Sequence, residues 1–261
     1  MMKNGKNIIA LLTDFGIKDY FIGAMKGVIL SIIKNAEIVD ITHEIPPQNI
    51  RSASFVLSAC YKNFPEKTIF TTVVDPGVGS NRRAILVETE NYYFIAPDNG
   101  LLNFIFDNEK DFRVFELTVD KFFNKPVSKT FHGRDIFSPA AAHLSNGVKP
   151  EEFGAEIKDF IFHKTESPKR LDENTIEAEI IHADHFGNLI TNLKKGDLPE
   201  KFTLEINGKK IEKLQSFFAE AKAGELFMIF GSADFLEIAA NQNSAKRILK
   251  AKVGQKIAVN G

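Results

Sequence analysis

Cysteine is nearly absent from this chain, since Cys60 is the only one in 261 residues. A lone cysteine excludes an internal disulfide and is typical of a reducing compartment, which predicts a cytoplasmic protein. Long apolar runs are also missing, so the sequence predicts no membrane-spanning segment. The apolar residues 8–12 form a stretch that is too short and wrongly flanked for a signal peptide.

An excess of charge of one sign is missing as well, because 33 basic and 34 acidic residues leave a formal net charge of -1. Binding to nucleic acid depends largely on clustered basic side chains, so we expect no nucleic-acid partner. The chain also lacks internal repeats and low-complexity tracts. Its hydrophobic content of 44% is enough to bury a sizeable core, in one large domain or two modest ones.

Residues 1–162 alternate short β-rich apolar runs with helical patterns, which is typical of a three-layer α/β domain. We expect helices over residues 20–34, 49–64 and 135–144, and strands over residues 6–13, 37–42, 68–75, 84–89 and 92–97. In the first helix Ala24, Val28 and Ile32 form one row. In the second helix the apolar stripe includes Cys60, which predicts a packing role for its thiol.

The pattern changes beyond residue 162. Residues 163–174 are polar, contain Pro168 and lack periodicity, so we expect a linker there. Residues 175–261 then read as short strands with turns between them, over residues 175–182, 189–193, 202–206, 226–230 and 256–259. The predicted architecture is therefore an N-terminal three-layer α/β domain followed by a smaller, mostly-β C-terminal domain.

Three acidic residues stand at or near the ends of successive predicted strands, namely Asp14, Asp40 and Asp75. In open α/β sheets, ligands bind outside the carboxyl ends of the strands. An acidic residue at a strand end also often caps the next turn, and this interpretation is preferred for Asp40. Asp14 and Asp75 each lead into a glycine-containing loop, which favours a functional role for both.

The loop after Asp75, residues 76–80, contains two glycines whose backbone N–H groups can face an anion. It lacks the Gly-Lys-Ser/Thr run of a phosphate loop. Arg82 and Arg83 follow, and in extended backbone adjacent side chains point to opposite sides. At most one of them is expected to enter a pocket, while the other is a solvated or interface charge.

His132 lies between Phe131 and Gly133, directly before a predicted helix. This setting favours a functional role, whereas a structural role is expected for the other histidines, namely His43, His143, His163, His182 and His185. An Asp, an Arg and a His in one pocket can hold and activate water without a metal. No two Asp or His residues lie at ligand spacing on a common helix or strand, so we expect no metal and no other cofactor.

Two polar segments stand out in the C-terminal part. Residues 184–192 place an acid, an aromatic and an amide around Gly187, a combination that can stack on a base and pair with its edge. A polar β-turn explains the same residues if the segment is taken alone. Residues 230–237 offer similar polar groups and are equally ambiguous alone.

Taken together, these segments resemble the S-adenosylmethionine hydrolase (hydroxide adenosyltransferase) family, whose relatives include the fluorinase and chlorinase. The resemblance is carried by Asp19 and by residues 13–16, 23–27, 40–43, 74–79, 96–102, 132–135, 186–188 and 232–237. It follows nearly the whole chain in order. The resemblance implies a homotrimer with active sites between subunits, in which water attacks the ribose C5′ of S-adenosylmethionine and releases adenosine and L-methionine.

The resemblance also implies roles for individual residues. The water should be handled by Asp75, Arg82 and His132, and Arg82 is chosen over Arg83 because the family's arginine stands seven residues after its aspartate. Asp14 should hold the ribose hydroxyls. The other expected substrate contacts are Phe186 and Asn188 at the adenine, Asp184, Ser232 and Glu237 at adenosine or the methionine part, and Asp19.

The chain departs from the family pattern at two positions. Phe21 stands where a tyrosine is common, which removes a hydroxyl, and Gln48 stands where an aromatic is common, which changes one wall of the expected ribose pocket. The halogenase branch carries Tyr-Pro where this chain has Asp75-Pro76, which favours water over halide. Halide-dependent adenosyl transfer, a non-catalytic S-adenosylmethionine or adenosine sensor, and a metal-dependent phosphoesterase remain the alternatives.

Overall fold

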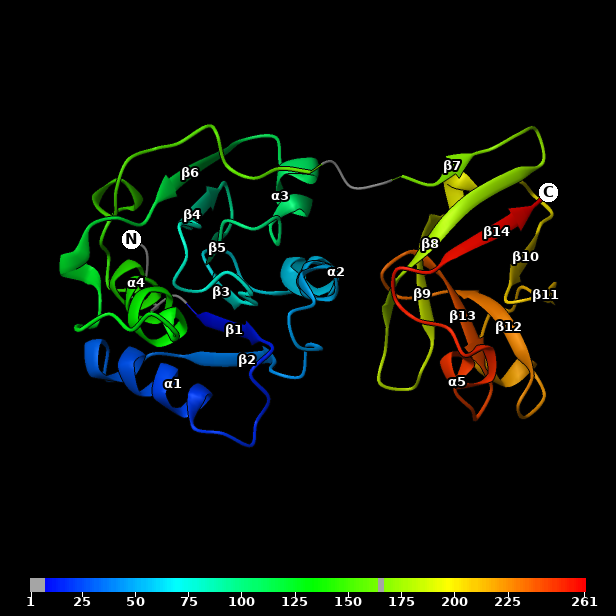
Figure 1. The fold of residues 1–261 in the computed structure, drawn as a ribbon, viewed down its shortest axis with the longest axis horizontal. Helices are drawn as coiled ribbons and strands as arrows, with labels where there is room; N and C mark the ends of the chain where they lie inside the picture. The colour runs from blue at the N-terminus through cyan, green and yellow to red at the C-terminus, as the bar shows by residue number, and fades with distance from the viewer. Residues whose placement is uncertain (1–7, 164–166) are drawn as a thin grey trace. The chain divides into compact units, whose positions relative to one another are not determined.

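The chain divides into two compact units, Met1–Thr165 and Glu166–Gly261 (Figure 1). The computed structural model describes residues 8–163 and 167–261. Residues 6–7 of the first predicted strand and residues 164–166 of the predicted linker therefore lie outside the described residues. The rest of that linker segment contains a short strand, β7 (Lys169–Arg170), which pairs with the strand that follows it.

The N-terminal unit is built on a six-stranded sheet in the order β2-β1-β3-β5-β4-β6. The first four of these strands are parallel neighbours, and β4 runs antiparallel to both β5 and β6. The strands are β1 (Ile9–Thr13), β2 (Ile38–Thr42), β3 (Ile69–Val73), β4 (Ala84–Thr89), β5 (Tyr93–Pro97) and β6 (Phe112–Glu116). Every residue of β1 and β3 is buried, as expected for parallel strands covered on both faces.

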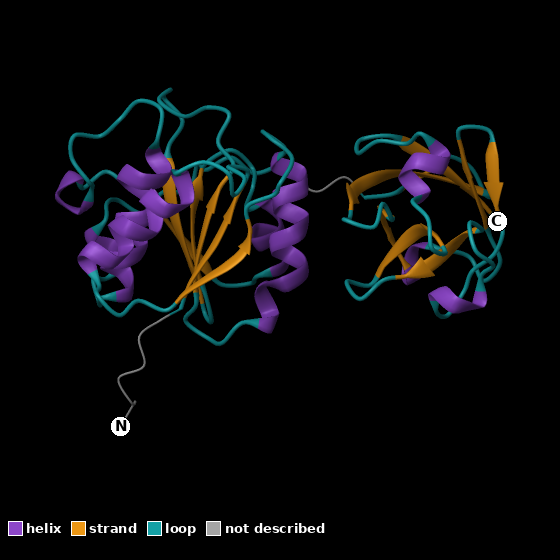
Figure 2. Cartoon of the chain, turned by 90° about the horizontal axis from the view of Figure 1, so that it is seen from below, coloured by secondary structure: helices purple, strands orange, loops and turns teal. Residues whose placement is uncertain are grey.

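Helices cover both faces of this sheet, which Figure 2 shows from below. The helices are α1 (Phe21–Ile32), α2 (Ile50–Cys60), α3 (Asn103–Asn108) and α4 (Ser138–Ser145). Alternate residues of β1 enter different cores: Ile9 and Leu11 pack with α1 and α4, while Ala10 and Leu12 pack with α2 and α3. The structure confirms the predicted three-layer α/β architecture.

The helices differ from the sequence prediction in detail. The most buried row of α1 is Ile22, Met25 and Ile29, and the predicted row of Ala24, Val28 and Ile32 flanks it half-buried. The predicted helix over residues 135–144 begins earlier, as a turn of π-helix over Gly133–Phe137 that continues into α4. Such π turns often occur at functional sites. This one starts directly after His132.

The C-terminal unit is an antiparallel β structure with the strand order β11-β10-β14-β8-β9-β13-β12. Its elements after β7 are β8 (Thr175–Ala183), β9 (Leu189–Lys194), β10 (Thr203–Ile206), β11 (Lys209–Ile211), β12 (Leu226–Phe230), β13 (Phe235–Ala240), α5 (Ala245–Leu249) and β14 (Lys256–Asn260). One apolar core gathers the inward residues of these strands together with Ala245 and Leu249 of α5. This confirms the predicted mostly-β C-terminal part.

Candidate active site

Asp14 and Asp75 meet at the carboxyl edge of the N-terminal sheet. β1 and β3 are parallel neighbours with Thr13 opposite Val73, so the residues that follow the two strands emerge together. Burial raises the pKa of Asp14, and the negative charge of Asp75 adds to this effect. The backbone N–H of Gln48 donates to Asp14 Oδ2 at 2.7 Å, and this hydrogen bond lowers the pKa of Asp14.

Asp75, Arg82 and His132 form one hydrogen-bonded chain. Arg82 Nε lies 2.9 Å from both Oδ1 and Oδ2 of Asp75, and Arg82 Nη2 also donates to Asp75 Oδ2. The same Nη2 lies 2.6 Å from His132 Nδ1. The side chains of Asp75 and Arg82 are only 4% and 10% exposed, which makes theirs a buried ion pair. The ring of Phe137 lies beneath the guanidinium, 5.3 Å from its carbon to the ring centroid.

The protonation state of His132 follows from its neighbours. Burial lowers the pKa of His132, and the Arg82 guanidinium lowers it further, so the neutral imidazole prevails at neutral pH. Arg82 can only donate, so Nδ1 must be the acceptor and the imidazole proton sits on Nε2. A hydrogen bond with the backbone of Ser128 favours the protonated ring and raises the pKa of His132, but burial and Arg82 outweigh it.

Two glycines allow the loops that carry these side chains to pack closely. Gly79 has φ +76°, and a Cβ there would overlap the carbonyl oxygen of Lys129. Gly133 packs against Met25 and Phe15, each 3.2 Å from the position a Cβ would take. A larger side chain at either position would push apart the segments that bring Arg82 and His132 together.

The neighbouring charges have structural partners. Arg83 was expected to be a solvated or interface charge, but it pairs within the chain with Asp98 at 3.0 Å and with Asp159 at 2.8 Å. Asp40 was expected to cap a turn, but it pairs with Lys26 at 2.5 Å and with His43 at 3.1 Å. Both corrections have the same physical reason, since a partner distant in sequence lies next to each charge in the fold.

In the C-terminal unit, Asp184 and Asn188 close a tight turn around Gly187. The backbone N–H and the side-chain Nδ2 of Asn188 each donate to Asp184 at 2.8 Å. Because the amide nitrogen is committed, the side-chain oxygen of Asn188 is the atom left for a ligand donor. Gly187 has φ +84°, and a Cβ there would overlap Ser244 at the start of α5.

Glu237 of β13 adds a second carboxyl group to this part of the unit. Burial raises the pKa of Glu237 to about 7, and the negative charge of Asp184 adds to the rise. The carboxyl group lies against Gly231, where a Cβ would overlap Oε1. Thus Asp184, Asn188 and Glu237 are brought close in the C-terminal unit, while Asp14, Asp75, Arg82 and His132 are brought close in the N-terminal unit.

The remaining predicted substrate contacts are exposed. Phe186 is 74% exposed and touches only the ring of His185 among the aromatic contacts of the described residues. Asp19 and Ser232 lie on exposed turns, before α1 and before β13. Phe21 packs against Phe15 and Phe131, so the position where a tyrosine is common belongs here to an aromatic cluster.

Sequence reasoning missed the supporting roles of three residues, although it had named Gln48 as part of the ribose pocket wall. Gln48 acts through its backbone, at φ 64°, and Phe137 acts as the apolar floor under Arg82. Asn99 donates to the carbonyl of Val74 at 2.9 Å and so braces the strand end that carries Asp75. Asn99 lies in residues 96–102, one of the segments that carry the family resemblance, and this was the sequence signal for its role. A contact made by backbone atoms, such as that of Gln48, leaves no signal in the sequence.

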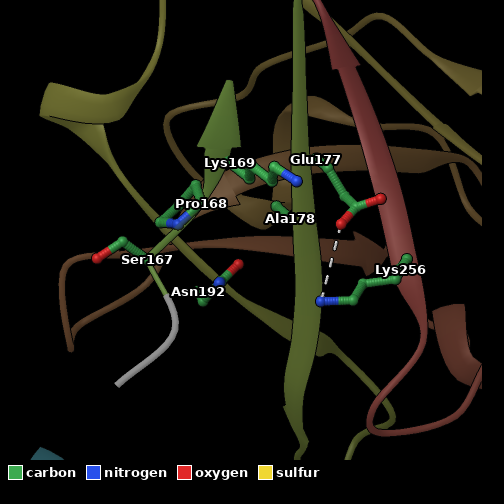
Figure 3. A pocket seen from close by; sticks show the side chains of 7 residues that line it. All are labelled: Ser167, Pro168, Lys169, Glu177, Ala178, Asn192 and Lys256. Atoms are coloured by element: carbon green, nitrogen blue, oxygen red, sulfur yellow. Dashed lines mark ion pairs between the residues drawn. The ribbon is translucent and has the colours of Figure 1, made fainter. Parts of the chain in front are cut away.

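Other features of the described residues point elsewhere. A hollow of about 410 Å³ in the C-terminal unit (Figure 3) is lined by Ser167, Pro168, Lys169, Glu177, Ala178, Asn192 and Lys256 rather than by the candidate residues. Within residues 8–163 and 167–261, no three His, Cys, Asp or Glu side chains gather as metal ligands would. No helix in those same ranges has the length and apolar character needed to cross a membrane.

Comparisons with known proteins bear on both units. The family model described as the SAM hydroxide adenosyltransferase N-terminal domain matches residues 9–154, and the model of the corresponding C-terminal domain matches residues 178–258. A solved structure, an uncharacterized conserved protein from Thermotoga maritima, is 37% identical and has a TM-score of 0.89, with 97% of this chain and 100% of that chain covered.

The named relatives include two hydrolases and a fluorinase that match most of this chain. The (R)-S-adenosyl-L-methionine hydrolase of Methanocaldococcus jannaschii is 35% identical over 93% of this chain and 92% of that protein. The protein of the same name from Thermus thermophilus is 34% identical over 95% of this chain and 98% of that protein. A fluorinase of Nocardia brasiliensis is 25% identical over 98% of both chains. With both family domains matched in order along one chain, the protein belongs to the SAM hydroxide adenosyltransferase family.

Proposed function

We propose that the protein hydrolyses S-adenosyl-L-methionine to adenosine and L-methionine by attack of water on the ribose C5′. In this reaction a C5′–O bond forms and the C5′–S bond breaks, the electron pair stays on sulfur as a neutral thioether, and one water proton is released. The observation that carries the proposal is the buried Asp75–Arg82–His132 chain at the carboxyl edge of the sheet, in a chain that matches both family domains.

The sulfonium is a good leaving group, so the protein's main task is the water. Proton transfer from water to an ordinary imidazole spans about 9 pKa units, or roughly 12 kcal/mol. The lowered pKa of His132 makes the imidazole a still weaker base. His132 alone therefore cannot hold free hydroxide in advance, and we propose that the proton passes to the Asp75 carboxylate, and from it to solvent, while the C5′–O bond forms.

The geometry supports a division of labour within the chain of three residues. A carboxylate has about four lone-pair sites, so Asp75 keeps acceptor capacity for a water after bonding Arg82. His132 has no lone pair left while Arg82 occupies Nδ1. We therefore propose that Asp75 orients the water in line with the C5′–S bond, and that His132 holds Arg82 in place. The guanidinium then supplies the positive charge that stabilises developing hydroxide.

The binding roles are proposals of the same kind. Asp14, whose neighbour Gln48 fixes one of its oxygens, should accept from the ribose hydroxyls. Asn188 should present its free side-chain oxygen to the adenine amino group, with Phe186 stacking on the base. The other polar residues of the set should together bind the α-ammonium group of the methionine part and the ribose; they are Asp19, Asp184, Ser232 and Glu237.

We also propose a homotrimer with active sites between subunits. Apolar side chains exposed on both units support an assembly, since Ile17, Tyr20 and Phe186 are 74%, 68% and 74% exposed. Sedimentation equilibrium should give three times the chain mass. Co-refolding of Asp75→Asn with Asn188→Ala chains should create some sites in which both halves are intact, and these sites should show the kcat that Asp75→Asn lacks together with the KM that Asn188→Ala lacks. The cytoplasm remains the predicted compartment, on the ground of the single cysteine.

The test uses purified protein in ¹⁸O-labelled water, first without and then with chloride, and mass spectrometry of the products. Adenosine that carries ¹⁸O at its 5′-hydroxyl, together with unlabelled methionine, is the expected result in both buffers. A chloride-dependent 5′-chloro product would replace the proposal by halide-dependent transfer, and tight binding without any product would replace it by a sensor. Loss of activity with a chelator would instead favour the metal-dependent phosphoesterase.

The substrate stereochemistry should be tested in the same assay. Four relatives carry the name (R)-S-adenosyl-L-methionine hydrolase. In that name L fixes the methionine α-carbon and adenosyl fixes the sugar, so (R) specifies the sulfonium. We propose a preference for the (R) epimer, which separate kcat/KM values for the two sulfonium epimers would measure.

A further inference from the structure

Asp135 is a charged residue at the heart of the N-terminal unit that the proposed reaction does not use. Its side chain is completely buried, in the turn of π-helix that follows His132. Burial alone would raise the pKa of Asp135, but its hydrogen bonds to Arg134, Ser128 and Asn124 outweigh this and hold the pKa low. The carboxylate therefore stays charged inside the protein, which calls for an explanation.

Four hydrogen bonds converge on this carboxylate from one short segment. Arg134 donates from Nε at 2.7 Å and from Nη2 at 2.9 Å. Asn124 Nδ2 donates at 3.0 Å, and the backbone N–H of Ser128 donates at 2.8 Å. Asp135 thus ties together the loop that runs from residue 124 to His132.

Ser128 connects this carboxylate with the candidate active site. Asp135 accepts from the Ser128 N–H at 2.8 Å, and the backbone of Ser128 also favours the protonated imidazole of His132, whose pKa it raises. The next residue, Lys129, presents its carbonyl to Gly79 of the loop between Asp75 and Arg82. The segment is therefore fixed from one side by Asp135 and packed on the other side against the loop that carries Arg82.

We propose that Asp135 is a positioning residue that, through the backbone of Ser128, fixes the imidazole of His132 with its proton on Nε2 and so presents Nδ1 to Arg82. The opposite tautomer would place an N–H against the guanidinium, which has only donors, and would leave the Ser128 carbonyl without its partner. The kinetic consequence rests on the proposed hydrolysis; the tautomer of His132 does not.

The experiment reads the tautomer directly by NMR of protein labelled with ¹⁵N-histidine, with His132 assigned by its loss in His132→Ala. In the wild-type protein we expect a protonated Nε2 and a bare Nδ1 above the His132 pKa. The charges that face His132 are Asp75, Arg82 and Asp135, and Asp135 raises the His132 pKa. Asp135→Asn should therefore lower the His132 pKa, weaken the tautomer preference and reduce kcat about tenfold, with KM within about twofold.

Three further variants separate positioning from a general effect on folding. Ser128→Pro removes the N–H that Asp135 holds together with the hydroxyl that bonds Thr130, and should reproduce the loss of tautomer preference while the Asp135 charge remains. Ser128→Ala removes the hydroxyl alone and should keep the tautomer preference. Asp120→Asn is the matched control, because Asp120 is an exposed carboxylate that pairs with Lys125 on the same segment. It should leave the tautomer, the His132 pKa and kcat unchanged.

The outcomes distinguish the two proposals. A wild-type spectrum with the proton on Nδ1 overturns the positioning role, and so does a folded Asp135→Asn protein whose His132 keeps its tautomer and pKa. If wild-type protein forms no adenosine while His132 still carries its proton on Nε2 and responds to Asp135→Asn, the proposed hydrolysis fails and the positioning role stands.

Discussion

The candidate residues of the two units differ in how far they bond to one another. In the N-terminal unit, the first group, Asp75 and Arg82 are almost fully buried, and Arg82 bonds both Asp75 and His132. In the C-terminal unit, the second group, Phe186 is 74% exposed and the side-chain oxygen of Asn188 is left for a ligand donor. The first group satisfies its own charges before any substrate arrives. The second group keeps unsatisfied capacity that a ligand can use. This contrast predicts that substitutions in the first group reduce turnover and stability together, and that substitutions in the second reduce affinity.

Among substitutions in the first group, Asp75→Asn should have the largest effect on turnover and stability. The change removes the acceptor proposed for water and leaves Arg82 buried without its carboxylate. We expect kcat to fall by at least about a hundredfold, more than substrate affinity does, and the free energy of unfolding to fall by about 3 to 5 kcal/mol. Steady-state kinetics and urea denaturation measure the two effects.

The matched control for this variant is Asp159→Asn. Asp159 pairs with the neighbouring Arg83 but its side chain is 81% exposed. Exposed pairs contribute about 0 to 1 kcal/mol, so stability and activity should change little. Equal losses of kcat and affinity in Asp75→Asn would argue against its assignment to the water. His132→Ala should also reduce turnover more than affinity.

The next comparison uses two adjacent arginines. Arg82→Lys keeps the charge but cannot hold Asp75 through two nitrogens and reach His132 as well, so kcat should fall about tenfold or more. Arg83→Lys disturbs only the pairs with Asp98 and Asp159, and kcat should stay within about twofold of wild type. A larger loss in Arg83→Lys than in Arg82→Lys would reverse the assignment of the two side chains.

The sequence indicated the edge of the sheet where the first group lies, because two aspartates there stand at the ends of predicted strands. Ligands bind at the edge where parallel strands end, which favoured a functional role for Asp14 and Asp75, and the pairing of β1 with β3 brings these two residues together. The choice of Arg82 over Arg83 came from the family spacing, and the structure pairs each arginine with a different partner. Gln48 bonds Asp14, and Ser128 bonds His132, through backbone atoms. The identity of a side chain gives no sign of such contacts.

The fold was missed where elements are short or where polar residues mask them. β13 lies partly in residues 230–237, for which the sequence indicated polar groups but predicted no strand, although Leu236, Ile238 and Ala240 alternate into the core. In the turn before β13, Asp234 adopts φ 62°, a conformation that glycine usually supplies. The sequence therefore gives little sign that the chain turns at this residue. α5 has only five residues, too few for a helical period to show.

In the C-terminal unit, Asn188→Ala should test affinity. Its side-chain oxygen is the proposed acceptor for the adenine amino group, and its Nδ2 bonds Asp184. Loss of one such hydrogen bond should raise KM about tenfold while kcat changes by less than about threefold. Isothermal titration with adenosine provides an independent measure, and a variant that loses kcat but not affinity would place Asn188 with the first group instead.

The smallest expected effect concerns the pH dependence that Glu237 gives the C-terminal unit. Because burial raises its pKa from the ordinary 4.5 to about 7, the folded protein holds a proton that the unfolded chain releases between these values. The contribution of Glu237 to stability is therefore fully present below about pH 4.5 and is lost as the pH rises towards 7. Glu237→Gln resembles the protonated form at every pH, so it should match wild type at pH 5 and be more stable at pH 8. Urea midpoints at both pH values check this, with the exposed Glu205→Gln as control, and parallel pH slopes in wild type and Glu237→Gln would show that the Glu237 carboxyl is ionised throughout.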